Sequence, residues 1–388
     1  MTRHSGPPIW SAPAQKGMPV EEIDTPALVL ELDPFERNLA RMARFAKENG
    51  LRLRPHAKMH KSVAVALEQL RLGAVGLCCQ KTSEAEALVA GGVTDILVTN
   101  QVVGPAKLAR LAALARRARV GVCVDDADNV AELGSASRAA GVTLDVYVEI
   151  DVGAHRCGVA PGPATAALAR VVALEPGLRL AGLQAYQGRA QHLRTPEERS
   201  VAIAAAAHAV RTARAALAEA GLNCPVVTGA GTGTFMLEAG TGVWNELQAG
   251  SYAFMDADYA RNEGARHFEY SLFVLATVMS RGGAAGDEQA ERLIVDAGLK
   301  AHSVDAGLPV VHADAAGNPL SGLTFRGASD EHGVIAVAPG VSAPRLGAKL
   351  RLIPGHIDPT VNLHDWIVCV RGGQVQEVWP VSARGAMW

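Results

Sequence analysis

The sequence predicts an α/β protein in which a (β/α)8 barrel of the TIM type precedes a mostly β domain. Three observations lead to this fold class. Eight short apolar runs alternate with alanine-rich helical segments over about 220 residues, which is the repeat of such a barrel. After about residue 270 the alanine-rich segments stop, and short valine, leucine and isoleucine runs follow between glycine and proline turns. The competing fold, a doubly wound sheet, usually has fewer strands and a glycine fingerprint after its first strand, which this sequence lacks.

The expected elements follow in chain order. A β-like segment at 23–32 precedes a helical segment at 34–49, where Leu39, Met42 and Phe45 recur at helical spacing. The barrel strands are expected at 51–53, 74–79, 96–99, 120–124, 144–150, 178–184, 225–228 and 245–249. Helices are expected between most of them, for example at 63–72, 83–90, 105–115, 127–139 and 197–220. The second domain is expected to contain strands at 271–278, 292–296, 333–337, 349–353, 366–371 and 374–379.

These patterns divide the chain into three parts. Residues 1–30 are expected to form an N-terminal segment and strand that pack on the β domain. Residues 31–268 are expected to form the barrel, and residues 269–388 the β domain. A chain of 388 residues is long enough for this arrangement, because single domains typically span about 50–250 residues.

Composition argues against several classes of function. The net charge is −2 and the basic residues are dispersed, so no basic surface for nucleic acid or an anionic membrane is expected. No apolar run approaches the length of about 20 residues that spans a bilayer, and residues 1–17 lack the apolar core of a secretion signal. The cysteines lack CxxC spacing and lie mostly in apolar strand-like runs, so we expect reduced thiols in a cytoplasmic protein.

The candidate catalytic residue is Lys58, which lies directly after the first expected barrel strand. It belongs to the segment Arg54-Pro55-His56-Ala57-Lys58-Met59-His60-Lys61-Ser62. Burial lowers the pKa of a lysine and makes it a nucleophilic amine suited to Schiff-base chemistry. The alternative is a surface lysine at a strand end. Because catalytic residues of such barrels follow the carboxyl ends of the strands, the position favours chemistry.

Polar residues follow the other expected strands in the same way. Those after strands two to six are Gln80, Asn100, Asp125, Asp126, Asp151, Arg156, Tyr186 and His192. A turn at 228–234 that contains Thr232 and Gly233 follows strand seven, and Gly250 and Ser251 follow strand eight. Glycines let backbone N–H groups approach a phosphate, and hydroxyls add donors. One such turn alone can be purely structural, but two on the last two strands predict a phosphate site near Lys58. For Arg156, the alternative is an ion pair with Asp151.

A second candidate site lies in the β domain at His356 and Asp358. In an extended segment, residues two apart point to the same side, so both could bind one cation. One imidazole and one carboxylate, completed by water, suit Mn²⁺ or Mg²⁺ better than a structural zinc ion. The alternative is turn chemistry beside Pro359.

Nearly the whole chain resembles the D-threonine aldolase and D-serine dehydratase-like family of pyridoxal-phosphate (PLP) enzymes, which have fold type III, the alanine racemase type. The resemblance rests on the Lys58 segment and on residues 149–158 around Arg156. Further motifs that carry it are Cys78-Cys79-Gln80-Lys81, Gln184-Ala185-Tyr186-Gln187-Gly188, the segment 247–256 and Val295-Asp296-Ala297-Gly298-Leu299-Lys300. It implies that Lys58 binds PLP covalently and that Arg156 donates to the phenolic oxygen of PLP. By position it also implies PLP contacts from Gln80, Tyr186, Thr232, Gly233, Gly250, Ser251 and Tyr259.

The resemblance also implies a reaction. His356 and Asp358 match the divalent-metal motif of the family, and the D-serine dehydratase branch has a cysteine where this chain has Asp358, so the aldolase branch is favoured. The implied reaction cleaves D-3-hydroxy-α-amino acids, such as D-threonine, D-allo-threonine or D-threo-3-hydroxyaspartate, to glycine and an aldehyde or glyoxylate, and also runs in reverse. His192 or a water on the metal is the expected base for the hydroxyl proton. We expect a homodimer in which the partner's β domain helps to close each active site.

Three other functions are alternatives to this one. Alanine racemase needs a tyrosine base from the second domain, and no tyrosine of this chain lies beyond Tyr270. A hydroxy-amino-acid dehydratase uses the same PLP and metal, and only Asp358 separates it from an aldolase. A PLP-carrier protein, the non-enzyme alternative, resembles the barrel alone. Segments 303–309, 364–366 and 379–385 resemble β-hydroxyaspartate aldolases, whereas the barrel resembles D-threonine aldolases equally, so the choice of substrate stays open.

Overall fold

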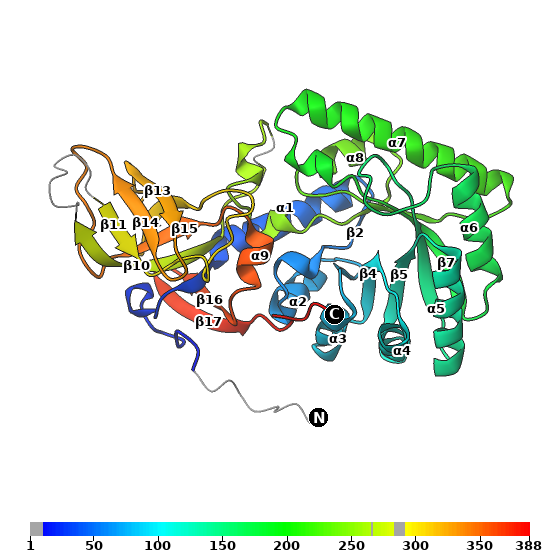
Figure 1. Cartoon of the computed structure of the whole chain (residues 1–388), viewed down its shortest axis with the longest axis horizontal. Coiled ribbons are helices and arrows are strands. Elements are labelled where there is room, and N and C mark those ends of the chain that lie inside the picture. The colour runs from blue at the N-terminus through cyan, green and yellow to red at the C-terminus, as the bar shows by residue number, and fades with distance from the viewer. Residues whose placement is uncertain (1–10, 265–266, 283–291) are drawn as a thin grey trace. The chain divides into compact units, whose positions relative to one another are not determined.

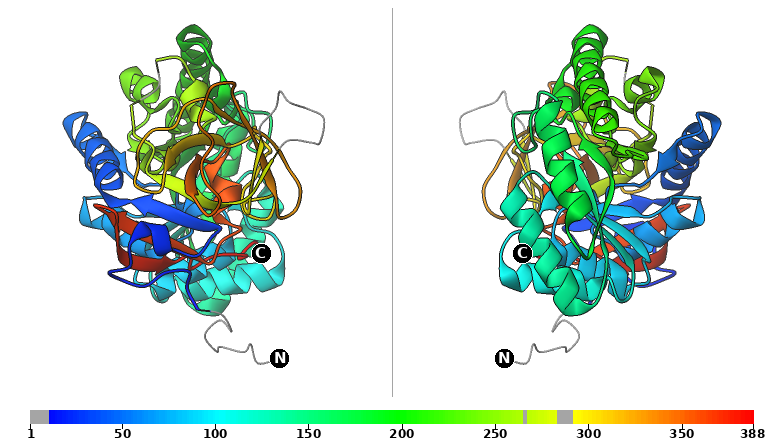
Figure 2. Two further views of the ribbon diagram at one scale, coloured as in Figure 1. Left: turned by 90° about the vertical axis from the view of Figure 1, so that its left-hand side faces the viewer. Right: turned by 90° about the vertical axis from the view of Figure 1, so that its right-hand side faces the viewer.

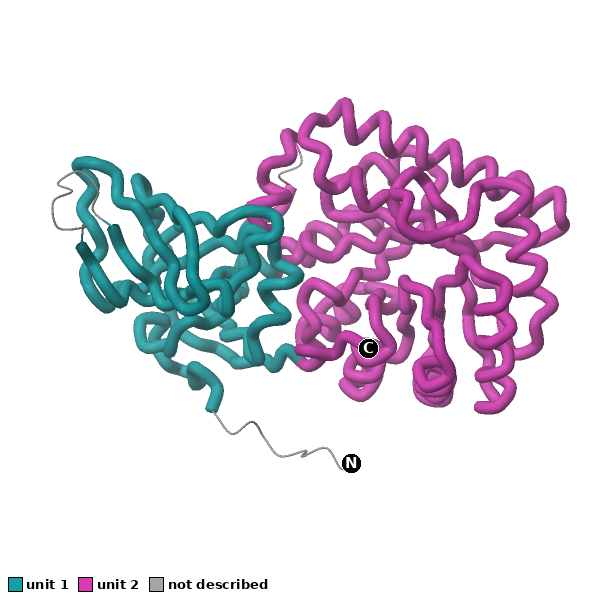
Figure 3. Tube along the Cα trace, in the orientation of Figure 1, with its two compact units in different colours: residues 1–35, 270–381 teal, residues 36–269, 382–388 magenta. Residues whose placement is uncertain are grey.

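The structure is a computed structural model that describes residues 11–264, 267–282 and 292–388. The chain forms two compact units, each assembled from segments that are distant in sequence (Figure 3). Unit 1 comprises residues 1–35 and 270–381, and unit 2 comprises residues 36–269 and 382–388. The chain therefore begins in unit 1, forms most of unit 2 with residues 36–269, returns to unit 1 and ends with seven residues in unit 2.

The strands of unit 2 form one parallel sheet in the order β2-β9-β8-β7-β6-β5-β4-β3. In chain order they are β2 (Arg52–Leu53), β3 (Leu77–Cys79), β4 (Asp95–Gln101), β5 (Arg119–Val124), β6 (Leu144–Glu149), β7 (Leu178–Ala185), β8 (Val226–Gly229) and β9 (Glu246–Leu247). The sheet closes on itself because the chain after β2 pairs with β3. His56 and Cys78 form a parallel bridge, and the Cys78 N–H donates to Pro55 O at 2.8 Å. The eight predicted barrel strands are therefore confirmed.

Helices lie outside the strands of unit 2 (Figures 1 and 2). They are α1 (Leu32–Glu48), α2 (Val63–Arg71), α3 (Thr82–Ala90), α4 (Pro105–Leu114), α5 (Ala127–Ala140), α6 (Pro163–Leu174), α7 (Pro196–Glu219) and α8 (Phe235–Thr241). One apolar cluster joins helix residues such as Leu88, Leu111 and Leu133 to strand residues such as Val122 and Val146. Both faces of each strand are buried, one under the helices and the other inside the barrel. The sequences of the strands are therefore continuous apolar runs.

The helix α7 is long and alanine-rich. Its first turn is fixed by a capping box, in which the Glu198 N–H donates to Thr195 Oγ1 at 3.2 Å and the Thr195 N–H donates to Glu198 Oε2 at 3.0 Å. Among the described residues, α7 is the one helix whose length and composition would allow it to cross a membrane. Its Ile203, Val210 and Leu217 are buried in the core of unit 2, as expected for an outer helix of a barrel.

A buried ionic network fills the barrel where its strands begin. The Arg54 guanidinium lies 3.0 Å from Glu246 Oε1 and 2.6 Å from Asp95 Oδ1. Arg54 and Glu246 are almost completely buried. The Cβ of any larger residue at Gly76 would stand 2.4 Å from the Arg54 guanidinium, so this glycine makes room for the arginine. The network closes the start of the barrel and leaves the carboxyl ends of the strands to form a site.

Unit 1 is built on a nine-stranded sheet that includes a strand from the N-terminal region. β1 (Ala27–Glu31) lies between β10 (Leu272–Gly282), to which it is antiparallel, and β16 (Trp366–Arg371), to which it is parallel. The other strands are β11 (Arg292–Val295), β12 (Val310–Asp314), β13 (Leu323–Ala328), β14 (Gly333–Val337), β15 (Lys349–Ile353) and β17 (Gln374–Pro380). A short helix, α9 (Ile357–Val361), follows β15. The mostly β second domain is thus confirmed, and β12 and β13 are additional to the strands that the sequence predicts.

Candidate active site

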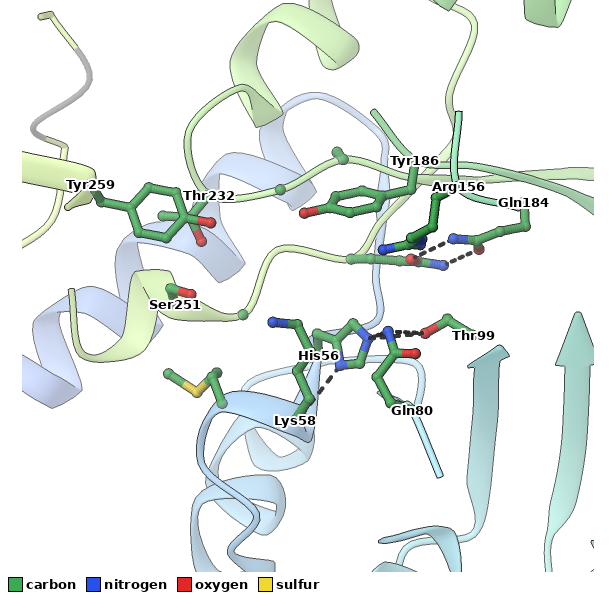
Figure 4. A pocket seen from close by; sticks show the side chains of 15 residues that line it. His56, Lys58, Gln80, Thr99, Arg156, Gln184, Tyr186, Thr232, Ser251 and Tyr259 are labelled. Carbon is green, nitrogen blue, oxygen red and sulfur yellow. Dashed lines mark hydrogen bonds between the residues drawn. The ribbon is translucent and has the colours of Figure 1, made fainter. Parts of the chain in front are cut away.

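The loops after the barrel strands line a pocket in unit 2 (Figure 4). The pocket contains about 600 Å³ of empty space and is partly open to solvent. Its side chains come from segments that follow β2, β3, β6, β7, β8 and β9 and from within β4 and β7, so the pocket lies at the end of the barrel where TIM-type enzymes carry out chemistry.

Lys58 lies in the 3₁₀ helix η2 (Ala57–Met59), and its amine end points into the pocket (Figure 4). The peptide N–H of Lys58 donates to Nδ1 of His56 at 3.3 Å. The other ring nitrogen, Nε2, lies 2.9 Å from Thr99 Oγ1 and 3.1 Å from the amide nitrogen of Gln80. These contacts tie the turn that carries Lys58 to β4 and fix where the lysine enters the pocket.

Two glycine-containing turns line the pocket together with Lys58. Gly231 and Thr232 follow β8, Gly250 and Ser251 follow β9, and the N–H of the next residue, Tyr252, donates to Thr232 Oγ1 at 3.0 Å. A Cβ at Gly250 would stand 2.6 Å from the backbone oxygen of His56, so this close approach requires glycine. Turns of this kind present backbone N–H and hydroxyl donors at short range, and this donor set fits the phosphate of PLP.

Arg156 brings positive charge to the pocket. Its guanidinium lies 5.8 Å from the centre of the Tyr186 ring and 3.8 Å from Glu149 Oε1. Burial raises the pKa of Glu149, although a hydrogen bond from Gln101 and the charge of Arg156 act in the opposite direction. A guanidinium held beside an aromatic ring and facing a pocket suits an anionic ring oxygen such as that of PLP.

Two buried glutamines form a rigid polar part of the pocket wall. Gln184 Nε2 donates to Gln248 Oε1 at 3.2 Å, and Gln248 Nε2 donates back to Gln184 Oε1 at 2.7 Å. Gln248 Nε2 also lies 2.8 Å from Thr228 Oγ1. Because each amide is fixed by its neighbour, both present a fixed hydrogen-bonding edge to a bound molecule.

Most residues predicted from the sequence come together in this pocket. Those that line it are Lys58, Gln80, Arg156, Tyr186, Thr232, Gly250, Ser251 and Tyr259. Gly233 does not line it, and its N–H donates to Gln191 Oε1 at 2.9 Å. Sequence reasoning did not select His56, Met59, Thr99, Gln184, Ala230, Gly231 and Gln248, which also line the pocket. Gln184 and Gln248 stand at the ends of two expected strands, and that position was a usable signal.

His192 lies beside the pocket rather than in its wall. It ends the 3₁₀ helix η3 (Arg189–His192), and its ring centre is 6.2 Å from that of the pocket residue Tyr259. Its Nδ1 lies 2.6 Å from Asp258 Oδ2. Burial alone would raise the pKa of Asp258, but hydrogen bonds from Arg194, His192 and Arg261 lower it below its usual value. An ionised carboxylate therefore faces His192.

The candidate metal ligands His356 and Asp358 belong to unit 1. The sequence predicts an extended segment here, and this prediction is wrong. The helix α9 begins at Ile357, and only its N-cap residue, His356, is extended. The two side chains nevertheless meet, with His356 Nε2 3.8 Å from Asp358 Oδ2. His356 Nδ1 lies 2.8 Å from Asp305 Oδ2, a contact that the sequence did not predict. Among the described residues, no group of three or more His, Cys, Asp or Glu side chains could hold a metal ion.

The closed parallel barrel with its lysine and glycine turns, joined to a β unit, defines the class of fold-type-III PLP enzymes. Residues 30–258 match the family model of the alanine racemase N-terminal domain, and residues 271–370 match that of a putative serine dehydratase domain. The fold alone is shared with alanine racemase from Clostridium difficile, at a TM-score of 0.72 and 12% identity.

More similar relatives identify the family within this class. D-threonine aldolase from Arthrobacter is 51% identical, and the alignment covers 96% of each chain. 3-Hydroxy-D-aspartate aldolase from Paracoccus denitrificans is 48% identical over 97% of this chain and 96% of its own. The crystal structure of D-threonine aldolase from Filomicrobium marinum matches with a TM-score of 0.93 and 50% identity over 98% of this chain and all of that one. The chain belongs to this family of PLP-dependent D-3-hydroxy-amino-acid aldolases, and the family predicted from the sequence is confirmed.

Proposed function

We propose that the protein cleaves D-3-hydroxy-α-amino acids of the D-threonine, D-allo-threonine or D-threo-3-hydroxyaspartate type to glycine and an aldehyde or glyoxylate, and that it catalyses the reverse. It is thus a carbon–carbon lyase. The observation that carries the proposal is that Lys58, Arg156 and the two glycine turns line one pocket in the barrel. The chain that builds this pocket is about half identical to aldolases over nearly its whole length.

The pocket residues would hold PLP in one orientation. Lys58 would bind it covalently, the turns at Thr232 and Ser251 would bind its phosphate, and Arg156 would donate to its phenolic oxygen. Gln80, Tyr186 and Tyr259 line the same pocket and would pack around the cofactor. When bound, PLP accepts the electron pair that remains on Cα after the Cα–Cβ bond breaks.

We propose His192 as the base that takes the proton of the β-hydroxyl. As this proton leaves, the hydroxyl oxygen becomes the carbonyl oxygen of the aldehyde and the Cα–Cβ bond breaks. A proton added to Cα then completes glycine, so the products together contain all the atoms of the substrate. The proposal is supported by the position of His192 beside Tyr259 and by its contact with the ionised Asp258.

We propose that residues 31–268 form the PLP-binding domain and that residues 269–388 form a domain for a divalent cation, Mn²⁺ or Mg²⁺, with residues 1–30 packed on it. His356 and Asp358 would be the protein ligands. The side chains fit this role, because they approach to 3.8 Å and Asp305 binds the other ring nitrogen of His356, as partners of metal-binding histidines commonly do. A divalent cation held there would supply Lewis-acid chemistry.

We propose that the active form is a cytoplasmic homodimer in which the β domain of the partner helps to close the active site. The family resemblance supports the dimer, and so do exposed apolar side chains on unit 1, such as Leu308, Val310 and Leu346. The cysteines of the described residues are all free, as expected in the cytoplasm. Sedimentation at nanomolar concentration should show dimers, and full activity in a purely monomeric sample would contradict the proposal.

One incubation separates the proposed reaction from its alternatives. The purified protein is mixed with PLP, Mn²⁺ and either D-threonine or D-threo-3-hydroxyaspartate, and the products are identified by mass spectrometry. An aldolase yields glycine with acetaldehyde or glyoxylate. Ammonia with a keto acid would instead identify a dehydratase, and no turnover with any 3-hydroxy-amino acid would favour a PLP carrier. The ratio of kcat/KM for the two substrates decides the preferred side chain.

A further inference from the structure

We propose that Asp258 is a positioning residue that holds His192 in the tautomer protonated on Nδ1, so that Nε2 is the free proton acceptor. The proposal deepens the proposed function and rests on it for its catalytic meaning. Its structural part stands on the contacts of Asp258. Asp258 Oδ2 lies 2.6 Å from His192 Nδ1, while its side chain is only 4% exposed.

The carboxylate must accept in this contact, because an ionised carboxylate has no proton to donate. Asp258 is held in the ionised form by two arginines, since Arg194 donates to Oδ1 at 2.6 Å and Arg261 contacts the same oxygen. His192 must therefore supply the proton from Nδ1. In a neutral imidazole the other nitrogen is then unprotonated and can take a proton from a substrate hydroxyl.

The two oxygens of Asp258 have different partners, and this division makes the inference testable. Both arginines bind Oδ1, whereas His192 faces Oδ2. In an Asp258→Asn variant, the arginines require the amide oxygen at the Oδ1 position, because they can only donate. The amide NH₂ group then occupies the Oδ2 position and donates to Nδ1 of His192. The variant should thus move the ring proton to Nε2 and remove the proton acceptor.

A competing explanation is that Asp258 serves only to clamp two loops together. Arg194 also donates to the backbone oxygen of Asp258 at 2.9 Å and to Asn262 Oδ1 at 2.6 Å, so these loops are joined independently of His192. Arg194→Gln is the matched control, because it loosens this clamp and leaves the carboxylate of Asp258 facing His192. A clamp-only role predicts that both variants leave the tautomer unchanged.

The test is ¹⁵N NMR of histidine-labelled full-length protein with PLP, at an alkaline pH where histidine side chains are in general neutral. The chain has 12 histidines, and the signals that disappear in His192→Gln identify the ring of interest. We expect protonated Nδ1 in the wild type and in Arg194→Gln, and protonated Nε2 in Asp258→Asn. Protonated Nε2 in the wild type overturns the inference, and this measurement holds even if the Asp258 variant does not fold.

Kinetics of D-threonine cleavage add a second readout. We expect Asp258→Asn to lower kcat about 100-fold or more with a smaller change in KM, because general-base catalysis contributes about 10²–10⁴-fold. A loss of kcat without a change of tautomer would show a clamp-only role and overturn the inference. Full activity in His192→Gln would instead remove His192 from the proposed mechanism, and the NMR result would still decide what Asp258 does to the ring.

Discussion

Lys58 is the residue on which the assignment of the cofactor depends most directly. We expect Lys58→Ala to lose the visible absorption band of lysine-bound PLP, because the variant has no amine at the pocket position where the cofactor is held. Lys61→Arg is the control. It removes a nearby amine but keeps a positive charge beside Glu84, whose Oε1 lies 3.2 Å from the Lys61 amine in the wild type. If borohydride still fixes PLP to Lys58→Ala, another lysine binds it.

Glu238 provides a residue-level prediction about pH. This carboxyl is buried in α8, and burial raises its pKa to about 7, although Thr234 Oγ1 donates to it at 2.7 Å. The folded state therefore keeps a proton that the unfolded chain has already lost between about pH 4.5 and pH 7. The free energy of unfolding should fall as the pH rises through this window and should be level above it.

The Glu238→Gln variant isolates this contribution, because an amide of similar shape does not titrate. The wild type minus the variant gives a difference in free energy of unfolding. This difference should decrease by at most about 3 kcal/mol between pH 4.5 and pH 8, because one pKa unit corresponds to about 1.4 kcal/mol. Urea denaturation at both pH values measures it. An identical pH dependence in both proteins would show that Glu238 is ionised in the folded state.

At the scale of elements, the start of the barrel depends on Arg54. Arg54→Met would remove one of the two arginines that lie 3.0 Å from the fully buried Glu246, the other being Arg52, and we expect a loss of about 3 kcal/mol in the free energy of unfolding. Arg71→Met is the matched control, because Arg71 pairs with Glu68 on the exposed surface of α2 and should contribute at most about 1 kcal/mol. Equal effects of the two substitutions would refute the structural role of the buried pair.

The same scale shows what the sequence could and could not predict. Parallel strands buried on both faces appear as apolar runs, and all eight barrel strands were found for this reason. β13 was missed because its apolar–polar alternation is short, running only from Leu323 to Arg326 before Gly327. The helix α9 was missed because it has five residues, too few for helical periodicity. The pairing of His192 with Asp258 joins residues 66 positions apart, and no local pattern indicates it.

At the scale of the whole molecule, the two candidate sites are built from residues of different units. The PLP pocket is built within unit 2, and the candidate metal ligands belong to unit 1. Each unit has its own sheet and its own buried core. Loss of the cation should therefore leave the barrel and its PLP site folded, while loss of the barrel lysine should leave the metal ligands in place.

This separation gives a prediction for metal removal. Two protein ligands leave most coordination positions to water and substrate, so EDTA should remove the ion easily. We expect EDTA to abolish cleavage while the absorption of bound PLP is retained, and Mn²⁺ to restore activity better than Ca²⁺, which prefers more oxygen ligands. Asp358→Ala should behave like the chelated enzyme, and Asp358→Cys should shift the preference towards Zn²⁺, because a thiolate is the softer ligand. Cleavage that survives both exhaustive chelation and Asp358→Ala would mean that His192 deprotonates the hydroxyl without a metal.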